Sequence, residues 1–156
     1  MAIPKTAAAQ RSRWVTREHP KIDRIACPWL IRRFIDPDAE IIYVPPHRVH
    51  ELMATGATAF DTFGAELGHV GERCSFDAFL ERYGLDDPAL AMLAKIVRGA
   101  DTARLDLAPE CAGLYAISLG LSARYGDDHQ MLEHGMVLYD ALHAWCEKQV
   151  STGVRA

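Results

Sequence analysis

A glycine-rich stretch near the middle of the chain collects side chains that can bind a metal ion. His69 lies three residues after Glu66, and Asp61 and Cys74 flank the pair. Imidazole, carboxylate and thiolate groups are the protein ligands of zinc, iron and manganese. The glycines of this stretch allow tight turns that can fold these side chains around one point. The alternative is a solvated loop followed by a capped helix.

Asp101 is a further carboxylate in an unusual position. It lies four residues after Val97 and continues an apolar helical stripe, which also contains Leu90, Leu93 and Ala94. A carboxylate on such a stripe needs a partner, because an unpaired buried charge is very costly. A metal ion would be one such partner. An ion pair with Arg98 or Arg104, or a role in capping the helix end, would be another.

These residues combine into one hypothesis for a metal centre. The proposed ligands are Glu66, His69 and Asp101, with Cys74 and Asp61 as additional candidates. A mixed nitrogen and oxygen set suits a divalent iron, manganese or zinc ion and leaves coordination positions open. Arg24 and Arg98 would attract an anionic substrate. A hydrogen-bond network of Glu66, His69 and Asp101 without a metal is the alternative.

A second hypothesis concerns the thiol of Cys27. Pro28 is favoured at the first position of a helix, which would place Cys27 near a helix N-terminus. Such a position, with Arg24 nearby, would lower the pKa of the thiol and make Cys27 and Arg24 candidate catalytic residues. The alternative is a half-buried cysteine on a core helix.

The elements that must position these groups follow from apolar spacing and turn residues. Strands are expected at 13–17, 40–44 and 57–61, with a helix from Pro28 and a short helix at 46–54 between them. Later helices are expected to begin near 75, 88, 109 and 127. The residues that mark these starts are Ser75 as a cap, Asp87 with Pro88, Pro109, and Asp127 with Gln130 as a capping box. We therefore expect an α+β fold, with a small, mostly parallel β-sheet from the N-terminal half and a helical C-terminal half.

Two further expectations concern domain organisation and helix packing. Residues 1–12 are small and polar and are expected to form a disordered lead, with a single domain over 13–150. The small residues Gly113, Ala116 and Gly120 predict that the helix containing them closely contacts a neighbouring helix.

Composition limits the classes of function. The chain has 156 residues, 49% hydrophobic and 24% charged, as expected of one globular domain. Its net charge of −4 argues against nucleic-acid binding by this chain alone. We expect no membrane span, because no apolar run reaches about 18 residues. No signal peptide is recognised, so we expect a cytoplasmic protein with four reduced cysteines.

Four segments together resemble a known family. They are the residues at 14–17 (WVTR), 23–36 (DRIACPWLIRRFID), 66–77 (ELGHVGERCSFD) and 96–101 (IVRGAD). The chain resembles the ChrB C-terminal domain family of chromate-resistance proteins from about 14 to 145. Longer members carry an N-terminal region linked to transcriptional control, or a rhodanese domain. The resemblance implies a bacterial-type stress response to chromate and supplies no settled reaction.

Three functions remain open from the sequence. The first is a metal-dependent enzyme or a domain that handles a metal and an oxyanion or metabolite. The second is a sensor that binds chromate or a thiol-reactive signal through Cys27 and Arg24 without turnover. The third is a helical interaction module with no small-molecule site. Self-association into a homo-oligomer is compatible with each of them.

Overall fold

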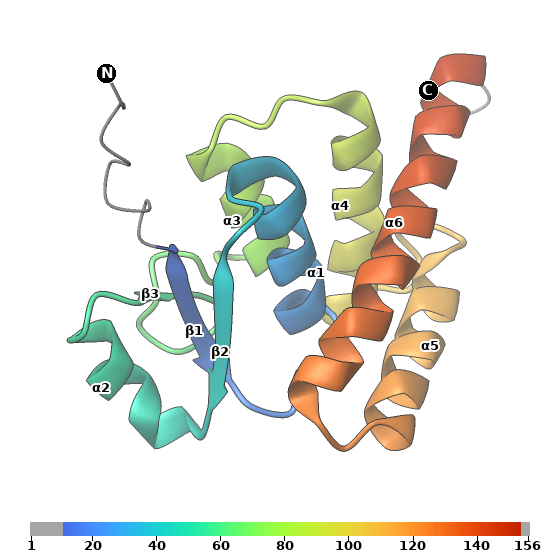
Figure 1. The fold of residues 1–156 in the computed structure, drawn as a ribbon. Coiled ribbons are helices and arrows are strands. Elements are labelled where there is room, and N and C mark those ends of the chain that lie inside the picture. Colours follow the sequence, from blue (N-terminus) through green and yellow to red (C-terminus); the bar gives the residue numbers. More distant parts are fainter. Residues whose placement is uncertain (1–10, 154–156) are drawn as a thin grey trace, which may run out of the picture.

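A three-stranded parallel sheet organises the N-terminal half of residues 11–153, the part of the chain that the computed structural model describes (Figure 1). The strands lie in the order β2-β1-β3, with bounds β1 (Arg13–Arg17), β2 (Glu40–Val44) and β3 (Thr58–Ala59). The predicted strands are therefore confirmed, although β3 is shorter than expected. The predicted α+β class is confirmed as well.

The two faces of the sheet carry different apolar clusters, because successive side chains along a strand point to opposite faces. Trp14 and its partner Ile41 belong to the main core, which they share with the helices of the C-terminal half. Val15 and Ala59 belong to a smaller cluster on the other face. The short helix α2 (Val49–Met53), entered through a 3₁₀ turn at Pro46–Arg48, contributes Val49 to that cluster.

Helices form most of the remaining chain. They are α1 (Asp23–Leu30), α3 (Ser75–Arg82), α4 (Pro88–Asp101), α5 (Cys111–Arg124) and α6 (Asp128–Thr152). Helix α1 packs against α3 and α6, and α4 packs against both α5 and α6 (Figure 1). This arrangement places the first turn of α1 and the last turn of α4 close to the loop that follows β3, where the candidate site lies.

Side-chain caps fix the starts of two long helices as the sequence predicts. The Asp87 carboxylate accepts hydrogen bonds from the N–H groups of Ala89 (2.7 Å) and Leu90 (3.3 Å). The Asp127 carboxylate accepts one from Gln130 N–H at 2.8 Å. Helix α3 differs in detail, because its N-cap is Cys74.

Helix α1 begins at Asp23, so the prediction that the helix starts at Pro28 was wrong. Pro28 lies inside α1, and a π-helical turn follows at Ile31–Ile35. A proline inside a helix has no N–H to donate to the carbonyl four residues earlier, here that of Arg24. The Tyr43 hydroxyl donates to this carbonyl instead, at 2.6 Å. The Tyr43 hydroxyl of β2 therefore replaces the backbone hydrogen bond that Pro28 cannot make to the Arg24 carbonyl.

Close helix packing occurs at glycines other than those expected. Helix α5 does pack against α4 and α6, as expected. A side chain at Gly113 or Gly120 would meet nothing within 4 Å among the described residues, so the prediction that these glycines make the contact was wrong. Instead, Gly135 of α6 lies directly against Ile25 of α1, and Gly99 of α4 lies against Cys111 of α5. The sequence alone does not reveal which glycine faces a neighbour.

The predicted disordered lead lies largely outside the described residues, because the structure describes the chain from residue 11 on. Ser12 is part of the fold. Its N–H donates to the Asp36 carboxylate at 3.2 Å, and its carbonyl accepts a hydrogen bond from Glu40 N–H at 2.8 Å. Ser12 also accepts from the Trp14 indole at 2.9 Å, which ties it to the start of β1.

Candidate functional site

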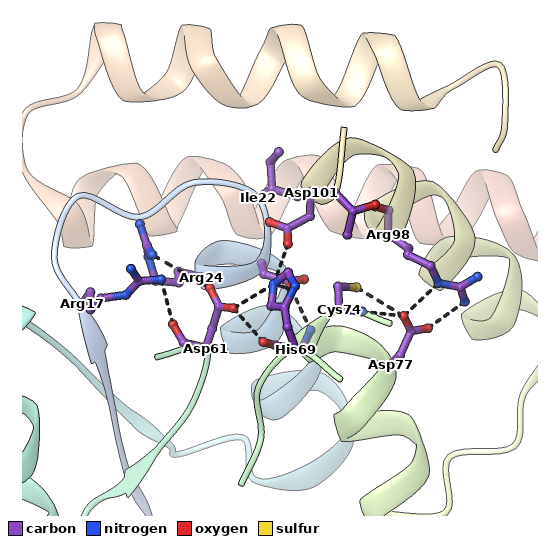
Figure 2. A network of polar contacts seen from close by, with 12 residues as sticks. Arg17, Ile22, Arg24, Asp61, His69, Cys74, Asp77, Arg98 and Asp101 are labelled. Atoms are coloured by element: carbon purple, nitrogen blue, oxygen red, sulfur yellow. Dashed lines mark hydrogen bonds and ion pairs between the residues drawn. The ribbon is translucent and has the colours of Figure 1, made fainter. Parts of the chain in front are cut away.

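Three carboxylates surround the imidazole of His69. Its Nε2 atom lies 2.9 Å from Asp101 Oδ2, 3.3 Å from Asp61 Oδ1 and 3.7 Å from Asp23 Oδ2. Figure 2 shows His69 between Asp61 and Asp101, with two arginines on one side. We call Asp23, Asp61, His69 and Asp101 the acidic cluster. The imidazole is 45% exposed, so the cluster opens to solvent on the His69 side.

Asp23 is the most buried member of the acidic cluster. It is the first residue of α1 and has no solvent exposure. Its Oδ2 accepts a hydrogen bond of 2.9 Å from the Ser75 N–H at the start of α3, while its Oδ1 has no hydrogen-bond partner among the described residues. Burial, followed by repulsion from Asp101 and Asp61, raises the pKa of Asp23 well above its ordinary value.

Asp61 is held where β3 leaves the sheet. Its backbone adopts a left-handed conformation (φ +45°), which few residues other than glycine adopt and which aspartate tolerates better than most. The Ser75 hydroxyl donates to Asp61 Oδ1 at 2.6 Å. Ser75 therefore orients two carboxylates at once, Asp23 through its amide and Asp61 through its hydroxyl, which is a common arrangement behind metal ligands.

Asp101 is the last residue of α4, as the continued apolar stripe suggests. Burial, followed by the charge of Asp61, raises the pKa of Asp101, while the nearby His69 and hydrogen bonds with the backbone and side chain of Asp23 lower it. The C-terminal end of a helix dipole also disfavours a carboxylate. Without a cation, the acidic cluster therefore favours binding a proton, because three ionised carboxylates would repel one another.

The donor set of the acidic cluster fits a divalent ion. Ligand atoms of Asp23, His69 and Asp101 all lie within 4.8 Å of one another. The fully buried carboxyl of Asp23 supports the same conclusion. It can hydrogen-bond to the Asp101 carboxyl only when the pair holds a proton, and a cation can take the place of that proton. One imidazole with several carboxylates suits manganese, iron or zinc.

Two arginines line a cavity of about 520 Å³ next to the acidic cluster. Arg24 Nη1 lies 3.9 Å from Asp61 Oδ2, and Arg17 Nη2 donates to the Asp61 carbonyl at 3.2 Å. The Nε atoms of both arginines are buried and have no hydrogen-bond partner among the described residues. Burial, followed by the charge of Arg17, lowers the pKa of Arg24. This cavity can accept an anion next to the acidic cluster.

A larger cavity, of about 670 Å³, lies elsewhere, with Met92, Ile96 and Leu107 in its wall. Lys95 is the one charged side chain among the described residues that line it. The described residues that line this cavity include no carboxylate, imidazole or thiol, so we do not regard it as the candidate site although it is larger than the cavity beside the acidic cluster.

The structure brings together some of the sequence-predicted ligands and separates others. His69, Asp101 and Asp61 meet as expected. Glu66 does not join them: its side chain is 82% exposed and pairs with Arg82 at 3.3 Å. The spacing of Glu66 and His69 would put both side chains on one face of a helix, but this loop is not helical, so the two diverge.

Cys74 and Arg98 belong to a separate network on the other side of His69 from the two arginines (Figure 2). Arg98 makes a two-pronged ion pair with Asp77, both distances being 2.9 Å. The Cys74 sulfur lies 3.4 Å from the same carboxylate, and burial, followed by the charge of Asp23, raises the pKa of the thiol. Arg98 is thus neutralised and does not line the 520 Å³ cavity, which argues against its predicted role in attracting substrate.

Cys27 does not lie at a helix N-terminus, because α1 begins at Asp23. Its thiol is fully buried, and burial, followed by the charge of Asp23, raises its pKa well above the ordinary value. The expectation of a lowered thiol pKa was wrong. The alternative of a cysteine on a core helix describes Cys27 correctly.

Sequence reasoning missed Asp23, Ser75 and Arg17 as site residues. Asp23 carried a usable signal, because it stands one helical turn before apolar Ala26 and Cys27 and so faces the core. Ser75 was expected only to cap α3. Arg17 ends β1, and residues at the carboxyl ends of parallel strands often line ligand sites.

Comparison with known proteins identifies the family. The family model described as ChrB, C-terminal domain, matches residues 14–146. Protein ChrB of Cupriavidus metallidurans (strain ATCC 43123 / DSM 2839 / NBRC 102507 / CH34) is 36% identical over 135 residues, which cover 86% of this chain and 40% of that protein. No solved structure matches the chain. Over the described residues, no helix is long and apolar enough to cross a membrane. The chain belongs to the ChrB C-terminal domain family.

Proposed function

We propose that this domain binds one divalent metal ion at the acidic cluster and holds an anionic small molecule beside it. Asp23, His69 and Asp101 would ligate the ion. Asp61 would be a fourth ligand or would accept a hydrogen bond from a water molecule bound to the ion. The observation that carries the proposal is the fully buried Asp23, whose carboxyl lies among two further carboxylates and an imidazole.

The chemistry available at such a site follows from its open side. A bound divalent ion with a free coordination position polarises a substrate or activates a water molecule. Ser75 would orient two of the ligands, and Arg17 and Arg24 would hold the negative charge of the substrate. The buried thiol of Cys27 gives no support to a sensor that reacts through this cysteine.

Membership of the family supports a role in chromate resistance for the longer protein of which such a domain is a part. The chain spans about 40% of the curated relative, Protein ChrB. We propose that the domain contributes metal and anion binding to that role, as an enzyme whose reaction depends on the ion.

The metal content of purified, untagged protein tests the proposal. Wild type should retain or take up one divalent ion per chain after stripping and reloading with manganese, iron or zinc. His69→Ala and Asp23→Asn should lose the ion, while Glu66→Ala should keep it, because Glu66 lies outside the acidic cluster. Circular dichroism verifies that each variant is folded.

Two results would overturn the proposal. One is a wild-type protein that cannot be loaded with any of the three ions. The other is a folded His69→Ala variant whose metal content equals that of wild type.

A further inference from the structure

We propose that the 520 Å³ cavity binds a small organic carboxylate, with its carboxylate group between the metal ion and Arg17 and Arg24, and its apolar body against Phe63. This inference rests on the proposed metal site and names the class of ligand that the site would serve. Four features of the cavity carry it.

The first feature is the pair of guanidinium groups. Arg17 and Arg24 both line the cavity, and neither Nε atom has a hydrogen-bond partner among the described residues. Two guanidinium groups side by side repel each other. Asp61 faces them, with its carboxylate 3.9 Å from Arg24, and an anionic ligand in the cavity would reduce the repulsion further. A planar carboxylate matches the fork of N–H donors that a guanidinium presents.

The second feature is the stiff support behind Arg24. Its backbone carbonyl accepts the Tyr43 hydroxyl at 2.6 Å, and its Nη2 donates to the His19 carbonyl at 3.2 Å. Its Nη1 faces Asp61 at 3.9 Å. Arg24 is therefore positioned before a ligand arrives, which reduces the entropy lost on binding.

The third feature is the balance of charge in the loaded site. Asp23, Asp61 and Asp101 supply three negative charges, because carboxylates that ligate a metal are ionised. A divalent ion and two arginines supply four positive charges. The loaded site therefore retains a single positive charge, which one monoanionic carboxylate balances and a dianion exceeds.

The fourth feature is the exposed ring of Phe63 in the wall of the cavity. Phe63 is 96% exposed, although a phenyl ring gains free energy when it leaves water. It precedes Gly64, whose backbone has a φ of +79°, a conformation that glycine adopts readily. An inorganic anion would leave the ring in water, whereas a ligand with an apolar body would cover it. This contact distinguishes an organic carboxylate from a simple oxyanion.

Calorimetric titration of the metal-loaded protein with three probes tests the inference. The probes are benzoate, acetate and inorganic phosphate. Benzoate should bind more tightly than acetate, and phosphate should bind most weakly. Phe63→Ala should weaken benzoate binding about tenfold and leave acetate binding unchanged. Val70→Ala is the matched control, because Val70 is an exposed apolar residue of the same loop that does not line the cavity.

The arginines and the ion have tests of their own. Arg17→Gln should weaken benzoate and acetate alike without changing the metal content. Stripping the metal should weaken both carboxylates in wild type.

The contrary outcomes separate this inference from the proposed function. Two results would contradict the assignment of an organic carboxylate and leave the metal site intact. One is tighter binding of phosphate than of benzoate, and the other is a Phe63→Ala variant that binds benzoate as tightly as wild type does. If benzoate and acetate bind with the same affinity with and without the ion, the ligand's carboxylate does not lie between the ion and the two arginines. A protein that binds no metal overturns the proposed function and this inference together.

Discussion

Asp23 combines full burial with two neighbouring carboxylates, and this combination makes the metal-free site costly. A group of this kind contributes to stability only when it is protonated or when a cation is bound.

The stability of the metal-free protein should depend on Asp23 and on pH. The pKa of Asp23 is raised in the folded chain, so between the unfolded value of about 3.9 and the raised value the native state binds more protons. Stability should consequently fall as pH rises through that range. Asp23→Asn removes this titration. In urea unfolding of stripped protein between about pH 4 and 8, the free energy of unfolding of this variant should therefore depend less on pH than that of wild type.

Asp101 contributes to the same slope, so Asp23→Asn should reduce the pH dependence without abolishing it. Glu66→Gln is the control and should keep the wild-type slope, because Glu66 lies outside the acidic cluster. Equal slopes for wild type and Asp23→Asn would contradict the account of this residue.

The cysteines should resist alkylation in the folded protein. All four are buried, and burial raises the pKa values of Cys27, Cys74 and Cys111. Peptide mapping after iodoacetamide treatment at neutral pH should find little labelling of any of them, and rapid labelling once the chain is unfolded in urea. Fast labelling of Cys27 in the folded chain would restore the hypothesis of a reactive thiol.

At the scale of elements, the site depends on a close approach of α6 to α1. Gly135 of α6 lies against Ile25, two residues after Asp23, and a side chain at 135 would collide with it. Gly135→Ala should destabilise the protein by about 1–3 kcal/mol, because overpacking forces the helices apart. Gly113→Ala should be neutral or stabilising by up to about 1 kcal/mol, because this position faces open space in a helix.

Thermal or urea unfolding of both glycine variants measures the difference. If Gly135→Ala is as stable as wild type, the helices do not meet as closely as described. If Gly113→Ala is strongly destabilising, a partner covers α5.

Elements with strong local signals were predictable, and those governed by distant contacts were not. Asp87 and Asp127 marked the starts of α4 and α6, because their carboxylates cap the next turn. The start of α1 was missed, because Pro28 leaves the Arg24 carbonyl without its helical N–H donor, and the hydroxyl that replaces this donor belongs to Tyr43 in β2. Local sequence around a proline does not contain that information.

The candidate site combines residues from four separate parts of the chain, namely the start of α1, the end of β3, the loop before α3 and the end of α4. Sequence spacing predicted His69, Asp61 and Asp101, because chemically suited residues lay in a loop and on a buried stripe. It wrongly included Glu66, because pairing by spacing assumes a helix. It missed Asp23, because only the packing of α1 against α3 and α4 brings this residue to His69.

The whole molecule carries a net charge of −4, and this leads to a prediction about nucleic acids. Because this excess of negative charge opposes approach to the phosphates, we expect this chain not to bind duplex DNA specifically. Gel shifts with genomic fragments at physiological salt should show no complex below micromolar protein. A salt-sensitive complex at sub-micromolar protein would contradict this.

Calorimetric titration of stripped protein with Zn²⁺ or Mn²⁺, in two buffers of different ionisation enthalpy, tests whether the acidic cluster binds a metal ion. The metal should bind once per chain and release protons to the buffer, because the raised pKa of Asp23 favours its protonated form and a bound cation displaces the proton. Asp23→Asn should bind more weakly and release fewer protons, while Glu66→Gln should behave as wild type does. Absence of metal binding by wild type, or identical affinity and proton release in Asp23→Asn, would contradict the assignment of the acidic cluster as a metal site.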